Sequence, residues 1–265
     1  MYHQTIDYFA QFAARKSDLL KKRPEAIIIG AMMAGAYVGI GIILIFSVGA
    51  LADPASQKLI MGATFAIALT LVVFAGADLF TGYTMYMPLA MLKNICSLGD
   101  LIRIWLVVWI FNLVGSFLLA YIFALGGGGA LIGKADTLLI HVAEYKMNSP
   151  AIKLLARSIL CNWLVCLALW MAARTENDVA KCILIFWCLL AFIASGFEHS
   201  IANMTLFSIS LLGEHPETVS ISGMFYNLFW VTIGNTIAGV VLMAGAYWVA
   251  SPATLSLSDK PSNQE

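Results

Sequence analysis

The chain has 265 residues, of which 61% are hydrophobic and only 11% are charged, and its formal net charge at pH 7 is zero. Soluble domains carry about 25% charged residues, so this composition excludes an ordinary soluble domain and indicates a polytopic membrane protein. The balanced charge also excludes the concentrated basic face that nucleic-acid-binding proteins present.

Residues 1–25 form a polar leader that precedes the first apolar stretch. The leader contains Asp7 and Asp18 and has no apolar core, so we do not expect it to act as a cleavable signal peptide. Residues Thr5 to Leu20 have the pattern of an amphipathic helix with a basic cluster at its end. The apolar side of this helix would carry Ile6, Phe9, Phe12, Ala13 and Leu20.

Six uncharged stretches predict six transmembrane spans within one membrane domain, residues 26–250. We expect the polar tail after them, residues 251–265, to be disordered. The stretches run from Ala26 to Ala52, Leu59 to Ala77, Ile104 to Gly133, Ser158 to Ala173, Cys182 to Phe197 and Thr218 to Ser258.

The positions of Lys and Arg predict the orientation of the chain in the membrane. The leader is basic, and an even number of spans returns the C-terminus to the same side, so both termini are expected in the cytoplasm. Ten Lys and Arg residues would then lie inside and five outside. Those inside are Arg15, Lys16, Lys21, Lys22, Arg23, Lys93, Arg103, Arg174, Lys181 and Lys260, and those outside are Lys58, Lys134, Lys146, Lys153 and Arg157.

Two apolar segments are too long to cross the membrane as straight helices. At 1.5 Å per residue, Leu59 to Leu92 would measure about 51 Å and Cys182 to Gly213 about 48 Å, against roughly 30 Å of hydrocarbon. Each segment must therefore break. The small residues predict one break within Gly76 to Gly82 and the other at Ser195-Gly196.

The two long segments also resemble each other. Each has one acid after small residues, Asp78 in the first and Glu198 in the second, and an Asn precedes a Gly in the following span of each half, at Asn112 and Asn235. The predicted fold class is therefore an all-α membrane protein with two inverted three-span repeats, in which spans two and five are broken.

Broken helices at membrane depth are tolerated where they line a cavity or are buried in protein, and their N-termini favour an anion. A solute path between the repeats follows from this. Two alternatives stay open: Asp78 and Glu198 could simply cap the half-helices, and His199 could be a hydrogen-bonded core group. As a site residue, His199 would offer one donor when neutral and two when protonated.

Three segments carry a clear family resemblance: Gly196 to Met204, Ala77 to Thr81, and Cys161 to Cys166. They are similar to the signature segments of the formate/nitrite transporter family, and the resemblance covers residues 26–250. Two further segments, Met33 to Gly39 and Ala173 to Glu176, look more like the nitrite-channel branch of that family.

The resemblance implies an aquaporin-like protomer, a homopentamer with one pore per protomer, and passage of small monovalent weak-acid anions across the bacterial inner membrane. Nitrite is the expected substrate, with formate or hydrosulfide as alternatives. Both an anion channel and a proton-coupled carrier remain open. The leader helix would either lie on the inner leaflet or cover the pore mouth.

By motif, the resemblance makes His199 the central pore residue and Thr81 its hydroxyl partner. Nitrite would take a proton from His199 and cross as the neutral acid, or stay charged beside a fixed cation. The cytoplasmic constriction would be Leu69, Leu79 and Phe192, and the periplasmic constriction Phe65, Phe80, Asn162 and Val165. Lys146 and Asn235 match polar positions near the second break.

Other classes of protein are less favoured. An aquaporin-like channel for water or glycerol should carry Asn-Pro-Ala at both breaks, but neither break does. A metallohydrolase would need a second His near His199, and the stretch from Gly128 to Ala135 lacks the Ser or Thr of a phosphate-binding loop. The five cysteines show no disulfide or zinc spacing. No enzymatic activity, metal or cofactor is predicted.

Overall fold

The computed structural model describes residues 2–251, and all regular structure in that range is helical. Met1 and all but the first residue of the predicted 251–265 tail lie outside the described residues. The elements are α1 (His3–Lys22), α2 (Pro24–Gly49), α3 (Gln57–Ala75), α4 (Phe80–Leu92), α5 (Leu98–Leu125), α6 (Leu138–Met147), α7 (Ala151–Ala172), α8 (Asp178–Ala194), α9 (Ser200–Leu212), α10 (Ile221–Ile237), the π-helix η1 (Ala238–Gly245) and α11 (Ala246–Ala250).

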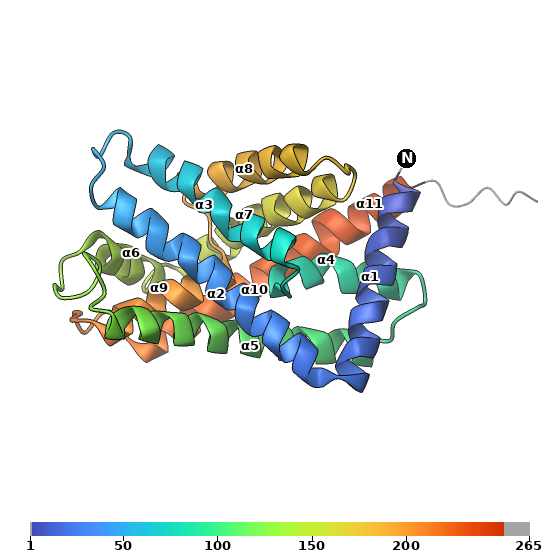
Figure 1. The fold of residues 1–265 in the computed structure, drawn as a ribbon, viewed down its shortest axis with the longest axis horizontal. Helices are drawn as coiled ribbons and strands as arrows, with labels where there is room; N and C mark the ends of the chain where they lie inside the picture. The colour runs from blue at the N-terminus through green and yellow to red at the C-terminus, as the bar shows by residue number, and fades with distance from the viewer. Residues whose placement is uncertain (1, 252–265) are drawn as a thin grey trace, which may run out of the picture.

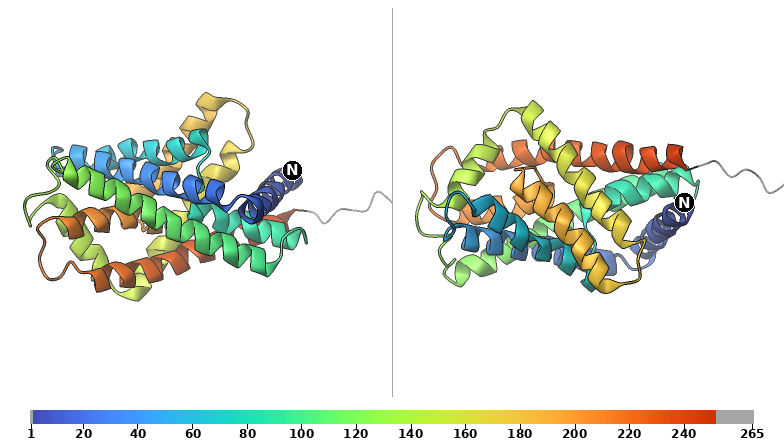
Figure 2. Two further views of the ribbon diagram at one scale, coloured as in Figure 1. Left: turned by 60° about the horizontal axis from the view of Figure 1, so that its bottom comes forward. Right: turned by 90° about the horizontal axis from the view of Figure 1, so that it is seen from above.

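The long helices form an elongated bundle, with α1 across one end and α6 near the other (Figure 1). Helix α2 packs against α3 and α5, and helix α7 packs against α8 and α10. Figure 2 shows the same bundle from two further sides. Within the described residues, five helical stretches are long and apolar enough to cross a membrane: α2, α3, α5, α7 and the continuous run from α10 to α11.

Close contact between α2 and α5 depends on glycine. A Cβ atom on Gly35 would collide with the backbone of Asn112, and one on Gly115 would collide with the backbone of Met32. Small residues at such crossings let helix backbones approach closely in a membrane. The small-residue face of α2 therefore packs within the protomer.

Both overlong segments are interrupted within the ranges that the sequence predicts. Helix α3 ends at Ala75, and Gly76 then takes the left-handed conformation with φ of 72°. Helix α8 ends at Ala194, and Gly196 repeats this conformation with φ of 71°. Glycine ends both helices because it adopts positive φ without steric cost. The chain then restarts as the short helices α4 and α9, whose residues are almost all buried.

The leader helix α1 packs on the rest of the protein. Its most extensive contacts are with α4, α2 and α5, and Phe9 also stacks on Trp170 of α7, so its apolar face is covered by protein. Ile6, Phe9, Ala13 and Leu20 are buried as the amphipathic pattern predicts, whereas Phe12 is only partly buried. At its C-terminal end, Lys21 forms an ion pair of 2.6 Å with Asp100 at the start of α5.

Candidate functional site

The two interrupted segments bring the N-termini of α4 and α9 together in the middle of the molecule. Thr81, near the start of α4, places its Oγ1 3.1 Å from Nε2 of His199, the residue directly before α9. Both side chains are buried. The structure thus joins the two residues that the family resemblance paired, although they lie 118 positions apart in the sequence.

The contact of the other ring nitrogen of His199 shows which nitrogen of the neutral imidazole carries the hydrogen. Nδ1 accepts the backbone N–H of Ala202 at 3.1 Å, so His199 is the N-cap of α9. An accepting Nδ1 carries no proton, and the neutral ring therefore has its hydrogen on Nε2, which donates to Thr81 Oγ1. The hydroxyl hydrogen of Thr81 remains free for another acceptor. A second ring proton would displace the Ala202 cap.

Asn112 on α5 holds the first interruption in place. Its Oδ1 accepts the backbone N–H of Phe80 at 2.9 Å. Its Nδ2 donates to the carbonyl of Asp78 at 2.9 Å and to that of Ala31 at 2.7 Å. One buried amide therefore bonds the first N–H of α4 and the carbonyl of Asp78, which lie at the interruption, and ties both to the Ala31 carbonyl of α2.

Asn235 on α10 makes the matching contacts at the second interruption. Its Oδ1 accepts the backbone N–H of Ser200 at 2.9 Å. Its Nδ2 donates to the carbonyl of Glu198 at 3.1 Å and to that of Ser158 at 2.8 Å. Each half of the chain thus uses one Asn to bond the first N–H of a short helix and the carbonyl of the adjacent acid.

Neither acid caps a half-helix, so the capping alternative is wrong. The N-cap residues of α4 and α9 are Leu79 and His199. Asp78 instead forms an ion pair of 2.7 Å with Lys16 of α1. It also accepts a hydrogen bond of 2.6 Å from the Tyr83 hydroxyl.

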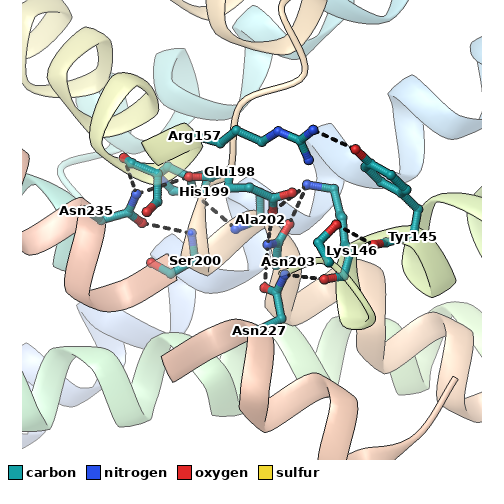
Figure 3. A network of polar contacts seen from close by, with 12 residues as sticks. Tyr145, Lys146, Arg157, Glu198, His199, Ser200, Ala202, Asn203, Asn227 and Asn235 are labelled. Carbon is teal, nitrogen blue, oxygen red and sulfur yellow. Dashed lines mark hydrogen bonds and ion pairs between the residues drawn. The ribbon is translucent and has the colours of Figure 1, made fainter. Parts of the chain in front are cut away.

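Glu198 likewise pairs with a lysine from a helix at the end of the bundle. Lys146 of α6 donates to Glu198 at 2.8 Å and to Asn203 at 3.1 Å (Figure 3). Asn203 donates to Glu198 at 2.7 Å and to Asn227 at 2.9 Å, and Asn227 donates to the Lys146 carbonyl at 2.9 Å. The result is a closed polar ring directly beside His199.

The aromatic residues of the two predicted constrictions meet next to the histidine. The Phe65 and Phe192 rings pack edge to face with centroids 5.5 Å apart, and Phe192 stacks on His199 at 6.1 Å. These two Phe residues belong to opposite predicted constrictions, yet they are in contact. The apolar region around His199 is therefore continuous on this side.

The remaining constriction residues are also buried, in differing environments. Phe80 packs edge-on against Trp105 of α5, with centroids 6.2 Å apart. Asn162 donates to the carbonyls of Thr81 and Asn235, at 3.3 and 2.7 Å, and so ties the two interruptions together. Its Oδ1 is buried without a hydrogen-bond partner. Buried with them are Leu69 and Val165.

A cavity of about 580 Å³ lies beneath α1. Phe9 and Phe12 of α1 line it together with Asp78, Leu79 and Tyr83 at the first interruption. The cavity therefore connects the leader helix to the start of α4, and Leu79 lies at its inner boundary.

Comparison with known proteins identifies the family of this chain. The sequence profile of the formate/nitrite transporter family matches residues 3–249. The chain belongs to the formate/nitrite transporter family. It is 50% identical over 262 residues to the protein of Escherichia coli K12 named nitrite transporter NirC, covering 98% of this chain and 97% of that protein.

Two solved structures have the same fold. One, described as an FNT family ion channel, superimposes with a TM-score of 0.92 at 49% identity, over 94% of this chain and 100% of that one. The other, described as a pentameric formate channel with formate bound, has a TM-score of 0.73 at 26% identity, over 87% of this chain and 98% of that one.

Three polar residues beside the predicted site were not predicted from the sequence as site residues: Lys16, Asn203 and Asn227. An Asn inside an apolar stretch is costly at membrane depth, so Asn203 and Asn227 did carry a signal. Lys16 carried none, because it is one of several basic residues in the leader. Only the packing of α1 on α4 brings Lys16 to Asp78.

Proposed function

We propose that this protein carries small monovalent weak-acid anions, above all nitrite, across the bacterial inner membrane through a pore in each protomer. The observation that carries this proposal is the buried hydrogen bond from Nε2 of His199 to Thr81 Oγ1, which leaves the hydroxyl hydrogen of Thr81 for an anion. The name of the E. coli relative supports nitrite as the substrate.

The surroundings of this hydrogen bond favour an anion. Two short helices begin there, and helix N-termini present a partial positive charge and unpaired N–H groups. The neighbouring apolar residues, including Phe65 and Phe192, would strip water from the anion, which is costly for a bare charge. The donors offset part of that cost.

The hydrogen bond that Nδ1 accepts from Ala202 distinguishes two versions of the mechanism, in which His199 acts either as a hydrogen-bond donor or as a proton donor. In the resting state the ring is neutral and its Nε2–H bonds to Thr81 Oγ1, so the hydrogen bond to the anion comes from the Thr81 hydroxyl, or from Nε2 once it releases Thr81. To give the anion a proton, the ring must first be protonated on both nitrogens, which releases the N–H of Ala202. Transient protonation would therefore be coupled to loosening of the first turn of α9.

An uptake and current measurement tests the function directly. Purified protein in proteoliposomes and planar bilayers would be compared with nitrite, formate and hydrosulfide at two pH values. Nitrite currents without proton movement would identify a channel, and obligatory proton co-movement a carrier. Transport of water or glycerol alone would contradict anion transport and favour an aquaporin-like pore.

We further propose that six spans form two inverted repeats, with α8 and α9 completing the fifth span. The matching contacts of Asn112 and Asn235 support this, as do the two left-handed glycines. With 17 residues, α8 is shorter than the five long apolar stretches, and α9 continues its segment after the interruption.

With six spans, we expect both termini in the cytoplasm and residues 127–152 in the periplasm. Reporter fusions at Thr254 and Thr137 should then show opposite sidedness. The basic leader and the charge bias of the loops are the physical reason. The same sidedness at both points would contradict the six-span arrangement.

We expect a homopentamer, which the description of the formate channel neighbour supports. Native mass measurement in mild detergent should give the mass of five chains of 28.7 kDa each. The glycine face of α2 is used inside the protomer, so the subunit contacts must involve other surfaces. A monomer or a tetramer would contradict the proposal.

Replacing Thr81 by Val should reduce nitrite uptake about fivefold, because it removes one hydrogen bond worth about 1 kcal/mol and leaves the ring in place. The matched control is Thr205→Val. The Thr205 hydroxyl is also buried but has no hydrogen-bond partner, so its loss should leave uptake nearly unchanged. Equal uptake by the two variants would exclude a role for the Thr81 hydroxyl.

A further inference from the structure

One cation near the second interruption has no carboxylate partner. Arg157 lies on α7, and the ion pairs of the described residues do not include it. Its Nη2 donates to the Tyr145 hydroxyl at 2.5 Å, and its guanidinium lies 5.2 Å from the centre of the Tyr145 ring. Its Nη1 is buried without a hydrogen-bond partner. This leaves a guanidinium edge with unused donors.

The unused donors lie beside the polar ring of the candidate site. The carbonyl of Arg157 accepts the backbone N–H of Glu198 at 3.4 Å, so the two residues are neighbours. Figure 3 shows one amino group of Arg157 bonded to Tyr145 and the other directed toward the Lys146–Glu198 pair. Because Glu198 already neutralises Lys146, the charge of Arg157 is left over.

Tyr145 holds the guanidinium without neutralising it. The hydrogen bond and the charge of Arg157 lower the pKa of the Tyr145 phenol. A buried donor without a partner is costly. A small anion would satisfy the charge and the donor together.

We propose that Arg157 forms an outer capture site for planar monovalent oxyanions beside the Lys146–Glu198 pair, on the side of the candidate site where α6 lies. This inference rests on the proposed anion transport. The guanidinium edge matches two oxygens of one anion, as in nitrite or formate, which a spherical or single-atom anion cannot reproduce. The captured anion then moves past Glu198 toward His199.

The test measures saturation of nitrite uptake by purified, assembled protein in proteoliposomes. Arg157→Gln is expected to raise the half-saturating nitrite concentration about fivefold, equivalent to about 1 kcal/mol, while the maximal rate changes less than about twofold. Arg157→Lys keeps the charge but loses the paired N–H donors of the guanidinium edge. It is expected to give an intermediate half-saturating concentration. Lys153→Gln is the control: it removes an equal charge from an exposed position on α7 and should keep the parental value.

Each outcome decides between the capture site and its alternatives. If Arg157→Gln and Lys153→Gln give the same half-saturating concentration, the capture site is wrong although nitrite transport stands. A fall in maximal rate alone would assign Arg157 a purely structural role. If Arg157→Gln does not assemble, Arg157→Lys decides, and a parental value there overturns the proposal. Parental protein that transports neither nitrite nor formate would overturn the proposed function and this inference with it.

Discussion

Replacing His199 by Asn is expected to abolish selective nitrite uptake while the protein stays folded. Asn can accept the N–H of Ala202 as an N-cap, so the start of α9 is preserved. The variant lacks the ring and its Nε2–H beside Thr81, however. A hydrogen bond to an anion contributes about 1.5–3 kcal/mol, so uptake should fall about 10- to 100-fold.

The comparison with His199→Phe separates transport from folding. Phe removes the cap as well as the donor and should lower stability by about 1 kcal/mol more than Asn does. Uptake by proteoliposomes and thermal unfolding in detergent would be measured on the same preparations. An assembled His199→Asn protein with the parental uptake rate and the parental pH dependence would contradict the histidine mechanism.

The second large effect is expected for Asn235→Leu, which should lower the stability of the protein or prevent its assembly. This substitution leaves the N–H of Ser200 and the carbonyl of Glu198 without their shared partner. At about 1–3 kcal/mol for each orphaned group, the loss is about 3 kcal/mol or more. The melting temperature in detergent should fall by about 6–12 °C, or the protein should fail to assemble.

Ser208→Ala is the matched control for this prediction. Ser208 is also buried on a short central helix, but its hydroxyl donates only to a carbonyl of its own helix, that of Met204. Its removal should therefore cost little. Asn112→Leu, at the equivalent place in the first half, should reproduce the Asn235→Leu defect. Parental stability of Asn235→Leu would mean that the break does not depend on this amide.

Much of the architecture was predictable because it follows from the hydrocarbon thickness of the membrane, which limits how long a straight transmembrane helix can be. Apolar stretches of 34 and 32 residues exceed the hydrocarbon thickness, and glycine is the residue that ends a helix with positive φ. The breaks near Gly76 and Gly196 were therefore readable from composition and spacing. The choice of His199 and Thr81 as partners required the family resemblance, because spacing alone does not pair residues in different halves.

An all-helical membrane protein with two interrupted segments is predictable from the chain alone, because hydrophobicity and glycine act locally. The partner of each polar group, in contrast, depends on how the helices pack. The tertiary structure assigned Asp78 to Lys16 and Glu198 to Lys146, and it made His199 the cap of α9. These partners lie on different helices, and a buried polar group takes whichever partner the packing brings within about 3 Å.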